Sequence, residues 1–357
     1  MIELRQDALV FRSPEVHRNA RFSIDFQRTL RIPDDGRTYP LPAGLGRFAL
    51  RHVDDVGSRV PTAWNARGGV MLPMYQAEAM WLNFSGNYPW AVKIAAGLIN
   101  AVTGDEWNTS LHCGQSLSHT AGRRRRSGSR GRADAAGQDY VTVPEQPWLD
   151  GFNVGSGTIR QFVAMPLGSG HTAEEQLTGK AEHGGLQVLA YPMKAQAYEK
   201  WCERRRRTEE TSYCLMDESA AGEASMCMEA APDMGLGLGG LMRQEILADP
   251  FGSDAWDLAH PSRCFVHLTN SEQWARITGE APPTPPPSAA DYAQAGIPWF
   301  DYYATGEAVP GSATLADLKS VSTVSAEQGS APIDDGSIPI DRVTVVRPRA
   351  EQVAERW

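Results

Sequence analysis

The chain has 357 residues, of which 41% are hydrophobic, which is enough for one large or about two ordinary domains with a sizeable core. Its formal net charge of −9 argues against a general binder of nucleic acid or of anionic membranes. No apolar run approaches the ~18–20 residues of a membrane span, and charges at Glu3, Arg5 and Asp7 interrupt the segment where a signal peptide has its apolar core.

Residues 1–109 are predicted to be rich in β-strands. Apolar and polar residues alternate between residues 21 and 32, and alternation at period two is typical of a half-buried strand. The AMWLNF run at residues 79–84 fits either a strand or a helix. Residues 91–102 contain several β-branched side chains, so we expect two short strands there, separated by Gly97.

Residues 110–137 differ in composition from the segments on either side. They include the run SLSHTAGRRRRSGSRGRADAAG, which is rich in Arg, Gly, Ser and Ala and almost free of large apolar residues. Such a segment has too little apolar surface to form a packed core, so a flexible, exposed insert is expected.

Residues 138–210 form the densest block, in which apolar runs, turn glycines and prolines follow one another. Thr172 and Glu175 match a capping box, which predicts a short helix that ends at Gly179. Apolar runs predict strands at residues 140–143, 158–165 and 186–191.

The block ends in a predicted helix at residues 194–210, where apolar side chains recur at helical spacing. Residues 211–240 are rich in Glu, Ala, Met and Gly and are predicted to form a second flexible insert. This insert includes the glycine run MGLGLGG at residues 234–240.

The C-terminal part, residues 241–357, contains a stiff proline-rich spacer at residues 282–287. A second capping-box pattern, Ser288 with Asp291, predicts another short helix, and residues 338–346 are predicted to be a strand. The mixture of strands with a few short helices predicts a β-rich α+β fold, with one or two mainly antiparallel sheets on which the C-terminal part packs.

Three short clusters combine tryptophan or tyrosine with aspartate. Aromatic faces stack on sugars or attract amines, while carboxylates accept hydrogen bonds or act as general acid and base. Asp150, Asp257 and Asp301 are therefore the candidate catalytic or ligand-binding acids. The clusters are Trp148-Leu149-Asp150, Asp254-Ala255-Trp256-Asp257 and Trp299-Phe300-Asp301-Tyr302-Tyr303.

Two other interpretations of these clusters stay open. The aromatic side chains are also suited to pinning long loops to the core, with each indole N–H bonded locally. They are equally suited to contacts between subunits, because Trp and Tyr are enriched where interfaces are strongest. On the interface or ligand interpretation the candidate residues are Trp148, Trp256, Trp299, Tyr302 and Tyr303.

Metal and cofactor sites have little support in the sequence. His171 and His183, with Glu174 and Glu175 nearby, are candidate metal ligands, but their spacing matches no standard motif and polar turn residues are the favoured interpretation. The glycine run at residues 234–240 has no strand pattern before it and no lysine after it, as phosphate-binding loops require. We therefore expect no cofactor.

The first insert carries six arginines between Arg123 and Arg132. Arginine runs bind phosphate backbones, but here no aromatic residue is interleaved to stack on bases. A solvated loop is the favoured interpretation, and nucleic-acid binding is the weaker alternative.

Three strings occur together: QDYVTVPEQPWLDG from Gln138, IRQFVAMPLGSG from Ile159, and RCFVHLTNSEQWARITGEAPPTPP with GIPWFDYY between Arg263 and Tyr303. On these strings, about half of the chain resembles an uncharacterised family of soluble predicted proteins from filamentous bacteria and fungi. The resemblance implies no activity and no site residue.

The five cysteines are scattered and form no CxxC pair, so reduced thiols in a cytoplasm are the simplest interpretation. The expected function is non-enzymatic: a cytoplasmic structural or interaction protein that forms homo-oligomers through aromatic loops and does not bind membranes. The alternative is a carbohydrate-type ligand binder or hydrolase that uses the Trp–Asp clusters.

Overall fold

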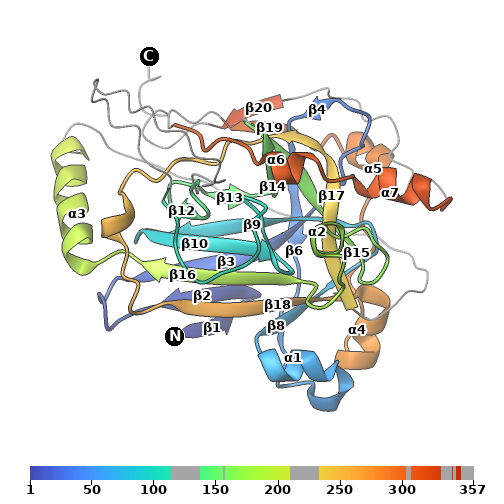
Figure 1. Ribbon diagram of the computed structural model, residues 1–357, viewed down its shortest axis with the longest axis horizontal. Coiled ribbons are helices and arrows are strands. Elements are labelled where there is room, and N and C mark those ends of the chain that lie inside the picture. Colours follow the sequence, from blue (N-terminus) through green and yellow to red (C-terminus); the bar gives the residue numbers. More distant parts are fainter. Residues whose placement is uncertain are drawn as a thin grey trace, which may run out of the picture.

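A computed structural model describes residues 1–113, 137–155, 157–209, 233–302, 307–330, 340 and 343–346. The fold is a β-rich α+β arrangement of one large sheet, one small sheet and short helices at the periphery (Figure 1). The predicted fold class is therefore confirmed. Within these residues, no helix is long and apolar enough to cross a membrane.

The large sheet contains 17 strands among the described residues, and nearly all of its pairs are antiparallel. Two pairs, β17 with β4 and β18 with β8, are parallel. The main run of hydrogen-bonded neighbours is β1 (Ile2–Arg5), β2 (Ala8–Arg12), β3 (Arg21–Thr29), β9 (Ala79–Gly86), β15 (Thr158–Pro166), β17 (Asp233–Arg243), β18 (Ser262–Asn270), β16 (Leu186–Pro192), β10 (Trp90–Ala96) and β12 (Val141–Val143).

Shorter strands extend this run at its sides. They are β4 (Thr38–Tyr39), β6 (Gly44–Arg47), β7 (Arg51–His52), β8 (Val70–Met74), β11 (Ile99–Asn100), β13 (Trp148–Leu149) and β14 (Gly151–Gly155). Strands from distant parts of the sequence thus share one sheet, and many of their buried apolar side chains form one large core.

Apolar and polar residues alternate along β3, which lies between two other strands of the N-terminal half. Phe22, Ile24 and Phe26 are almost fully buried, while the residues between them include more exposed ones. The strand pairs with β2 on one edge and β9 on the other. The predicted strand is confirmed, and the ambiguous run at residues 79–84 is also a strand, since it lies within β9.

The glycines of β17 lie in a buried strand, although the sequence suggested a flexible segment. The prediction of a flexible insert over residues 211–240 is wrong for residues 233–240, which form most of this buried strand. A Cβ atom on Gly237 would lie 2.7 Å from the carbonyl oxygen of His171 and 2.7 Å from Cγ2 of Val321. The glycines allow neighbouring segments to pack directly on the strand, which is one established use of glycine in sheets. Residues 211–232 lie outside the described residues.

The small sheet places β19 (Trp299–Tyr302) between β5 (Leu41–Pro42) and β20 (Val343–Val346). Trp299 is buried with Tyr39 and Tyr292 in a second, smaller core between this sheet and the large one. The small sheet therefore lies against the large sheet rather than extending it.

Helices begin where the sequence predicts caps. The hydroxyl of Thr172 accepts a hydrogen bond from the amide of Glu175, whose carboxylate accepts one from the amide of Thr172. Ser288 and Asp291 form the same reciprocal box. The helices are α1 (Thr62–Arg67), α2 (Ala173–Thr178), α3 (Ala195–Glu209), α4 (Ser271–Thr278), α5 (Ala289–Gln294), α6 (Ala313–Ala316) and α7 (Val321–Glu327), with 3-10 turns η1 (Gly57–Arg59) and η2 (Ser253–Ala255).

Buried glutamine side chains join the dense block to residues that follow β17. Gln146 donates to the carbonyl of Trp148 at 3.0 Å and accepts from the amide of Leu247 at 2.9 Å. Gln244 donates to Oδ2 of Asp150 and accepts from its backbone amide, at 2.9 and 3.0 Å. These side-chain amides replace strand-to-strand bonds and hold the Trp148–Asp150 segment in place.

The proline-rich spacer is tied to the sheet by buried polar groups. The hydroxyl of Tyr75 donates to the carbonyl of Pro283 at 2.7 Å, and Arg28 donates to the hydroxyl of Thr284 at 3.2 Å. Arg28 also pairs with the buried Glu78 at 2.6 Å. These bonds hold the proline-rich spacer against the large sheet.

Candidate functional site

An aromatic pocket with a volume of about 280 Å³ lies where the small sheet meets the large sheet. The small sheet contributes Leu41, Pro42, Phe300 and Val346. The large sheet contributes Trp81 from β9 and Trp148 from β13, and Asp150 follows β13 directly. We call this site the inter-sheet pocket; Ala43 and Gly44 complete its lining.

Two of the three predicted aromatic–acid clusters meet at this pocket. The ring centroids of Trp148 and Tyr302 are 4.8 Å apart, in an edge-to-face arrangement. The ring of Trp81 lies edge-on to Trp148 at 6.4 Å. Such edge-to-face contacts hold aromatic rings in fixed orientations, so the pocket walls are well defined.

Asp150 is the one charged or chargeable side chain in the described lining. It is only 5% exposed, and Gln244 supplies the hydrogen bond to its Oδ2. Burial raises the pKa of Asp150 to about 8, although the bond from Gln244 acts in the opposite direction. The carboxyl is therefore mostly protonated at neutral pH, and it can both donate and accept a hydrogen bond.

The other residues of the C-terminal cluster have different environments. Trp299 is buried in the second core, where it packs on Tyr292 and Tyr39. Asp301 is partly exposed and forms an ion pair with Arg243 at 3.1 Å. Tyr303 lies outside the described residues.

The third cluster is separate from the inter-sheet pocket. Trp256 is buried, donates from Nε1 to Asp249 at 2.9 Å, and packs edge-on against Phe251. Asp257 is near the surface and lies 3.1 Å from His260. This tryptophan is a loop anchor, which is one of the alternatives the sequence left open.

The sequence did not single out Trp81. It lies on β9, and its ring reaches the pocket because Gly44 leaves room: a Cβ at Gly44 would be 3.0 Å from Cζ2 of Trp81. A tryptophan in a strand pattern is usually a core residue. Only the position of the small sheet identifies Trp81 as a residue that lines the pocket. Trp81 lies on the partly exposed face of β9 with Asn83 and Ser85, and only the structure shows that the small sheet meets this face at Trp81.

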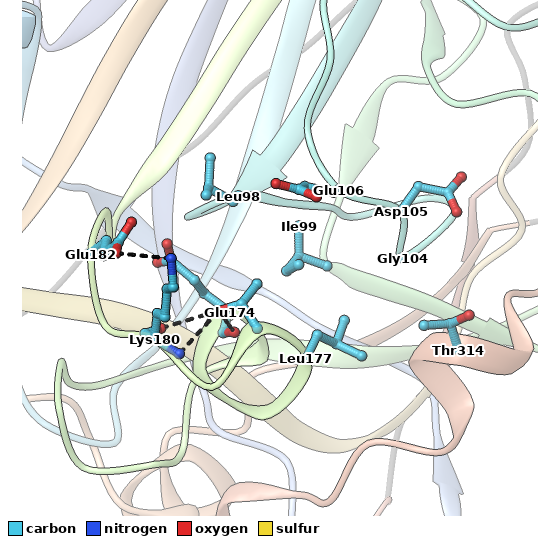
Figure 2. Close-up of a pocket in the computed structure, with 11 residues that line it drawn as sticks. Leu98, Ile99, Gly104, Asp105, Glu106, Glu174, Leu177, Lys180, Glu182 and Thr314 are labelled. Carbon is cyan, nitrogen blue, oxygen red and sulfur yellow. Dashed lines mark hydrogen bonds and ion pairs between the residues drawn. The ribbon is translucent and has the colours of Figure 1, made fainter.

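A second, larger hollow of about 600 Å³ lies beside α2 and the β10–β11 turn and is lined by several acidic side chains (Figure 2). Of these, Glu174 holds the neighbouring loop, because its carboxylate accepts from the amide of Gly184 at 2.9 Å and pairs with His183 at 3.0 Å. Lys180 pairs with Glu182 at 3.4 Å. This hollow is therefore an open surface feature built around a structural glutamate.

The candidate metal ligands His171 and His183 bond to protein groups instead. His171 is 3.0 Å from Ser325 through Nε2 and 3.0 Å from Ser169 through Nδ1. His183 pairs with Glu174. In the part of the chain that the structure describes, no three His, Cys, Asp or Glu side chains are grouped to hold a metal ion. The arginine run at residues 123–132 lies outside the described residues.

Comparisons with known proteins add no relative: no protein-family model, no curated protein and no solved structure matches this chain. The resemblance to an uncharacterised family therefore stays a prediction. Any functional conclusion must come from the geometry of the site itself.

Proposed function

We propose that this protein is a non-enzymatic binding protein that holds a small ligand with a flat or apolar body in the inter-sheet pocket. The observation that carries this proposal is the convergence of Trp81, Trp148 and Phe300 around the buried carboxyl of Asp150. Mostly apolar pockets with few, fixed polar groups are the usual form of small-molecule sites. The proposal follows the ligand-binding alternative and gives it a location.

Binding is better supported than hydrolysis. Glycosidases use a pair of carboxyl groups on either side of the bond that is cleaved. In the described lining, Asp150 stands without a second carboxyl, since Asp301 is paired with Arg243 and Asp257 belongs to the separate cluster. The proposal therefore gives Asp150 the role of orienting a ligand.

The test is a fragment screen by ligand-observed NMR on three proteins. Flat apolar fragments should bind the wild type and the control variant Trp201→Ala, whose indole packs on Tyr198 and Phe251 away from the pocket lining. They should bind Trp148→Ala about fivefold more weakly, because one aromatic contact contributes on the order of 1 kcal/mol. Equal binding to all three proteins would place the site elsewhere and refute the proposal.

Self-association remains a second proposal, and exposed valines on β20 favour it. Val343 and Val345 are 40% and 55% exposed on this strand, which pairs with β19 on one side. Edge strands with exposed β-branched residues tend to pair with other chains. Trp256 and Trp299 are buried in the chain's own core, whereas Trp148 and Tyr302 are the partly exposed aromatic candidates among the described residues.

Light scattering at micromolar concentration tests self-association. The wild type should have the mass of an oligomer, and Val345→Lys should reduce that mass toward a monomer, because an edge lysine opposes strand pairing. Leu258→Lys, at an exposed apolar residue outside β20, is the matched control for the added charge. A strictly monomeric wild type would end this proposal.

A further inference from the structure

We propose that the ligand of the inter-sheet pocket is an organic cation, an alkylammonium group on an apolar body, which Asp150 and the tryptophan faces recognise together. This inference rests on the proposed function and narrows it to one class of ligand. It also favours an amine ligand over a carbohydrate ligand.

Asp150 has no cationic partner in the part of the chain that the structure describes. Among the described residues, its side chain bonds to Gln244, which is neutral. Charged groups on the surrounding elements are paired with one another: Arg243 with Asp301 at 3.1 Å and Arg160 with Asp34 at 3.0 Å. Glu245, which follows Gln244, is exposed and of the same sign. A cation in the pocket would supply a countercharge for the ionised form of this buried acid.

The walls of the pocket are mainly aromatic and apolar. Trp81, Trp148 and Phe300 line the pocket, and Tyr302 packs on the edge of Trp148. Indole and phenyl faces attract cations, and tryptophan does so most strongly. An aromatic enclosure with one carboxyl is the arrangement that suits an ammonium group with hydrocarbon substituents.

A sugar fits this lining poorly. Each sugar hydroxyl that leaves water requires a hydrogen-bond partner, and an unpaired one costs on the order of 1–3 kcal/mol. Besides Asp150, the lining side chains are two indoles, four hydrocarbon side chains from Leu41, Pro42, Ala43 and Val346, one phenyl ring and glycine. One carboxyl does not satisfy the several hydroxyls of a sugar ring, whereas an alkylammonium ion needs only one countercharge.

Binding of a cation is expected to release a proton. Burial raises the pKa of Asp150 to about 8, so the empty pocket contains a neutral carboxyl at pH 7. When the cation enters, the O–H bond of the carboxyl breaks, the proton goes to solvent, and the carboxylate pairs with the ammonium group. Affinity should therefore rise up to tenfold per pH unit below about pH 8.

Calorimetry with matched probes tests the inference. Choline carries a quaternary ammonium group with a fixed charge, and 3,3-dimethylbutan-1-ol has nearly the same shape without the charge. Choline should bind the wild type at least tenfold more tightly than the neutral analogue. Titrations at pH 7 in phosphate and in Tris should show release of up to about one proton per choline bound.

Asp150→Asn is the matching variant, and it should fold because the native carboxyl is already mostly neutral; a thermal melt checks this. It should lose the preference for choline, the proton release and the pH dependence, while binding the neutral analogue as the wild type does. The neutral analogue or glucose could instead bind the wild type as tightly as choline, without proton release. That result would refute the cationic ligand and leave the binding role of the inter-sheet pocket supported. If none of the three probes binds, and the fragment screen also finds nothing, both proposals fall.

Discussion

Trp148-Leu149-Asp150 and Ala255-Trp256-Asp257 look alike in sequence and have opposite structural environments. In the first, the tryptophan is half-buried at a pocket and the aspartate is buried, with no cation beside it among the described residues. In the second, the tryptophan is buried beside Asp249 and the aspartate is near the surface beside His260. The aspartate is thus the more buried residue in the first cluster, and the tryptophan is the more buried residue in the second.

The difference shows that neighbouring residues in a chain need not share a role. A buried carboxyl without a countercharge is costly unless it is protonated, so its persistence at Asp150 is the unusual feature. A buried tryptophan with a bonded N–H is ordinary core packing. We therefore propose a binding role for the first cluster and a stabilising role for the second, and the following changes test that division.

The largest expected effect is from Trp256→Ala. Removing this buried indole leaves a cavity beside Tyr140 and Phe251 and removes a hydrogen bond to Asp249. The free energy of unfolding should fall by about 3–5 kcal/mol. Trp148→Ala should lower it by much less, because that ring is half-exposed. Urea denaturation of both variants measures this, and equal losses would contradict the division of roles.

The next effect concerns pH. Burial raises the pKa of Asp150 from 3.8 to about 8, so between these values the folded protein holds a proton that the unfolded chain has released. The contribution of this group to stability is complete below about pH 4 and is lost as pH rises to about 8, by at most about 1.4 kcal/mol per pH unit.

Asp150→Asn should remove this dependence, so the variant should become more stable relative to the wild type as pH rises. Urea denaturation at pH 5 and pH 7.5 measures the change. Other buried acids titrate in this range, Glu78 and Glu145 near pH 7 among them, so the comparison with wild type is the informative quantity. Asp257→Asn is the control, and its free energy of unfolding should change with pH as that of the wild type does. If Asp150→Asn showed this same pH dependence, the carboxyl of Asp150 would not be buried in solution.

A smaller effect is expected from Gln244→Ala. The change leaves the backbone amide of Asp150 and its carboxyl without their partner, and a lost buried hydrogen-bond partner costs about 1–3 kcal/mol. Ligand affinity should also fall, because Gln244 orients the carboxyl. Urea denaturation and the choline titration measure the two effects. An unchanged affinity for choline would show that Gln244 does not contribute to ligand binding.

The smallest effect is expected from Asp257→Asn. The partner His260 is largely exposed, and ion pairs of this kind contribute about 0–1 kcal/mol. Neither stability at pH 7 nor binding of fragments should change measurably. A loss of ligand binding in this variant would reverse the assignment of the two clusters.

The features that could be predicted from the sequence are those set by near neighbours. The alternation in β3 and the capping box of Thr172 with Glu175 have the same form in the structure, because each depends on residues only a few positions apart. The glycine run in β17 could not be interpreted in this way. Its glycines accommodate His171 and Val321, which are distant in sequence, so nothing local distinguishes them from loop glycines.

The sequence by itself determined the β-rich fold class, the caps of the short helices and the presence of aromatic–acid clusters, because these follow from local spacing and residue chemistry. Only the tertiary structure decided which cluster is a candidate site. The small sheet brings Phe300 to the pocket that Trp148 and Asp150 line, and among the described residues the side chain of Asp150 bonds to neutral Gln244, while Trp256 is enclosed by its own core. Burial and the partners of a charge depend on residues brought together from across the chain, and these set the pKa of Asp150 and the shape of its pocket.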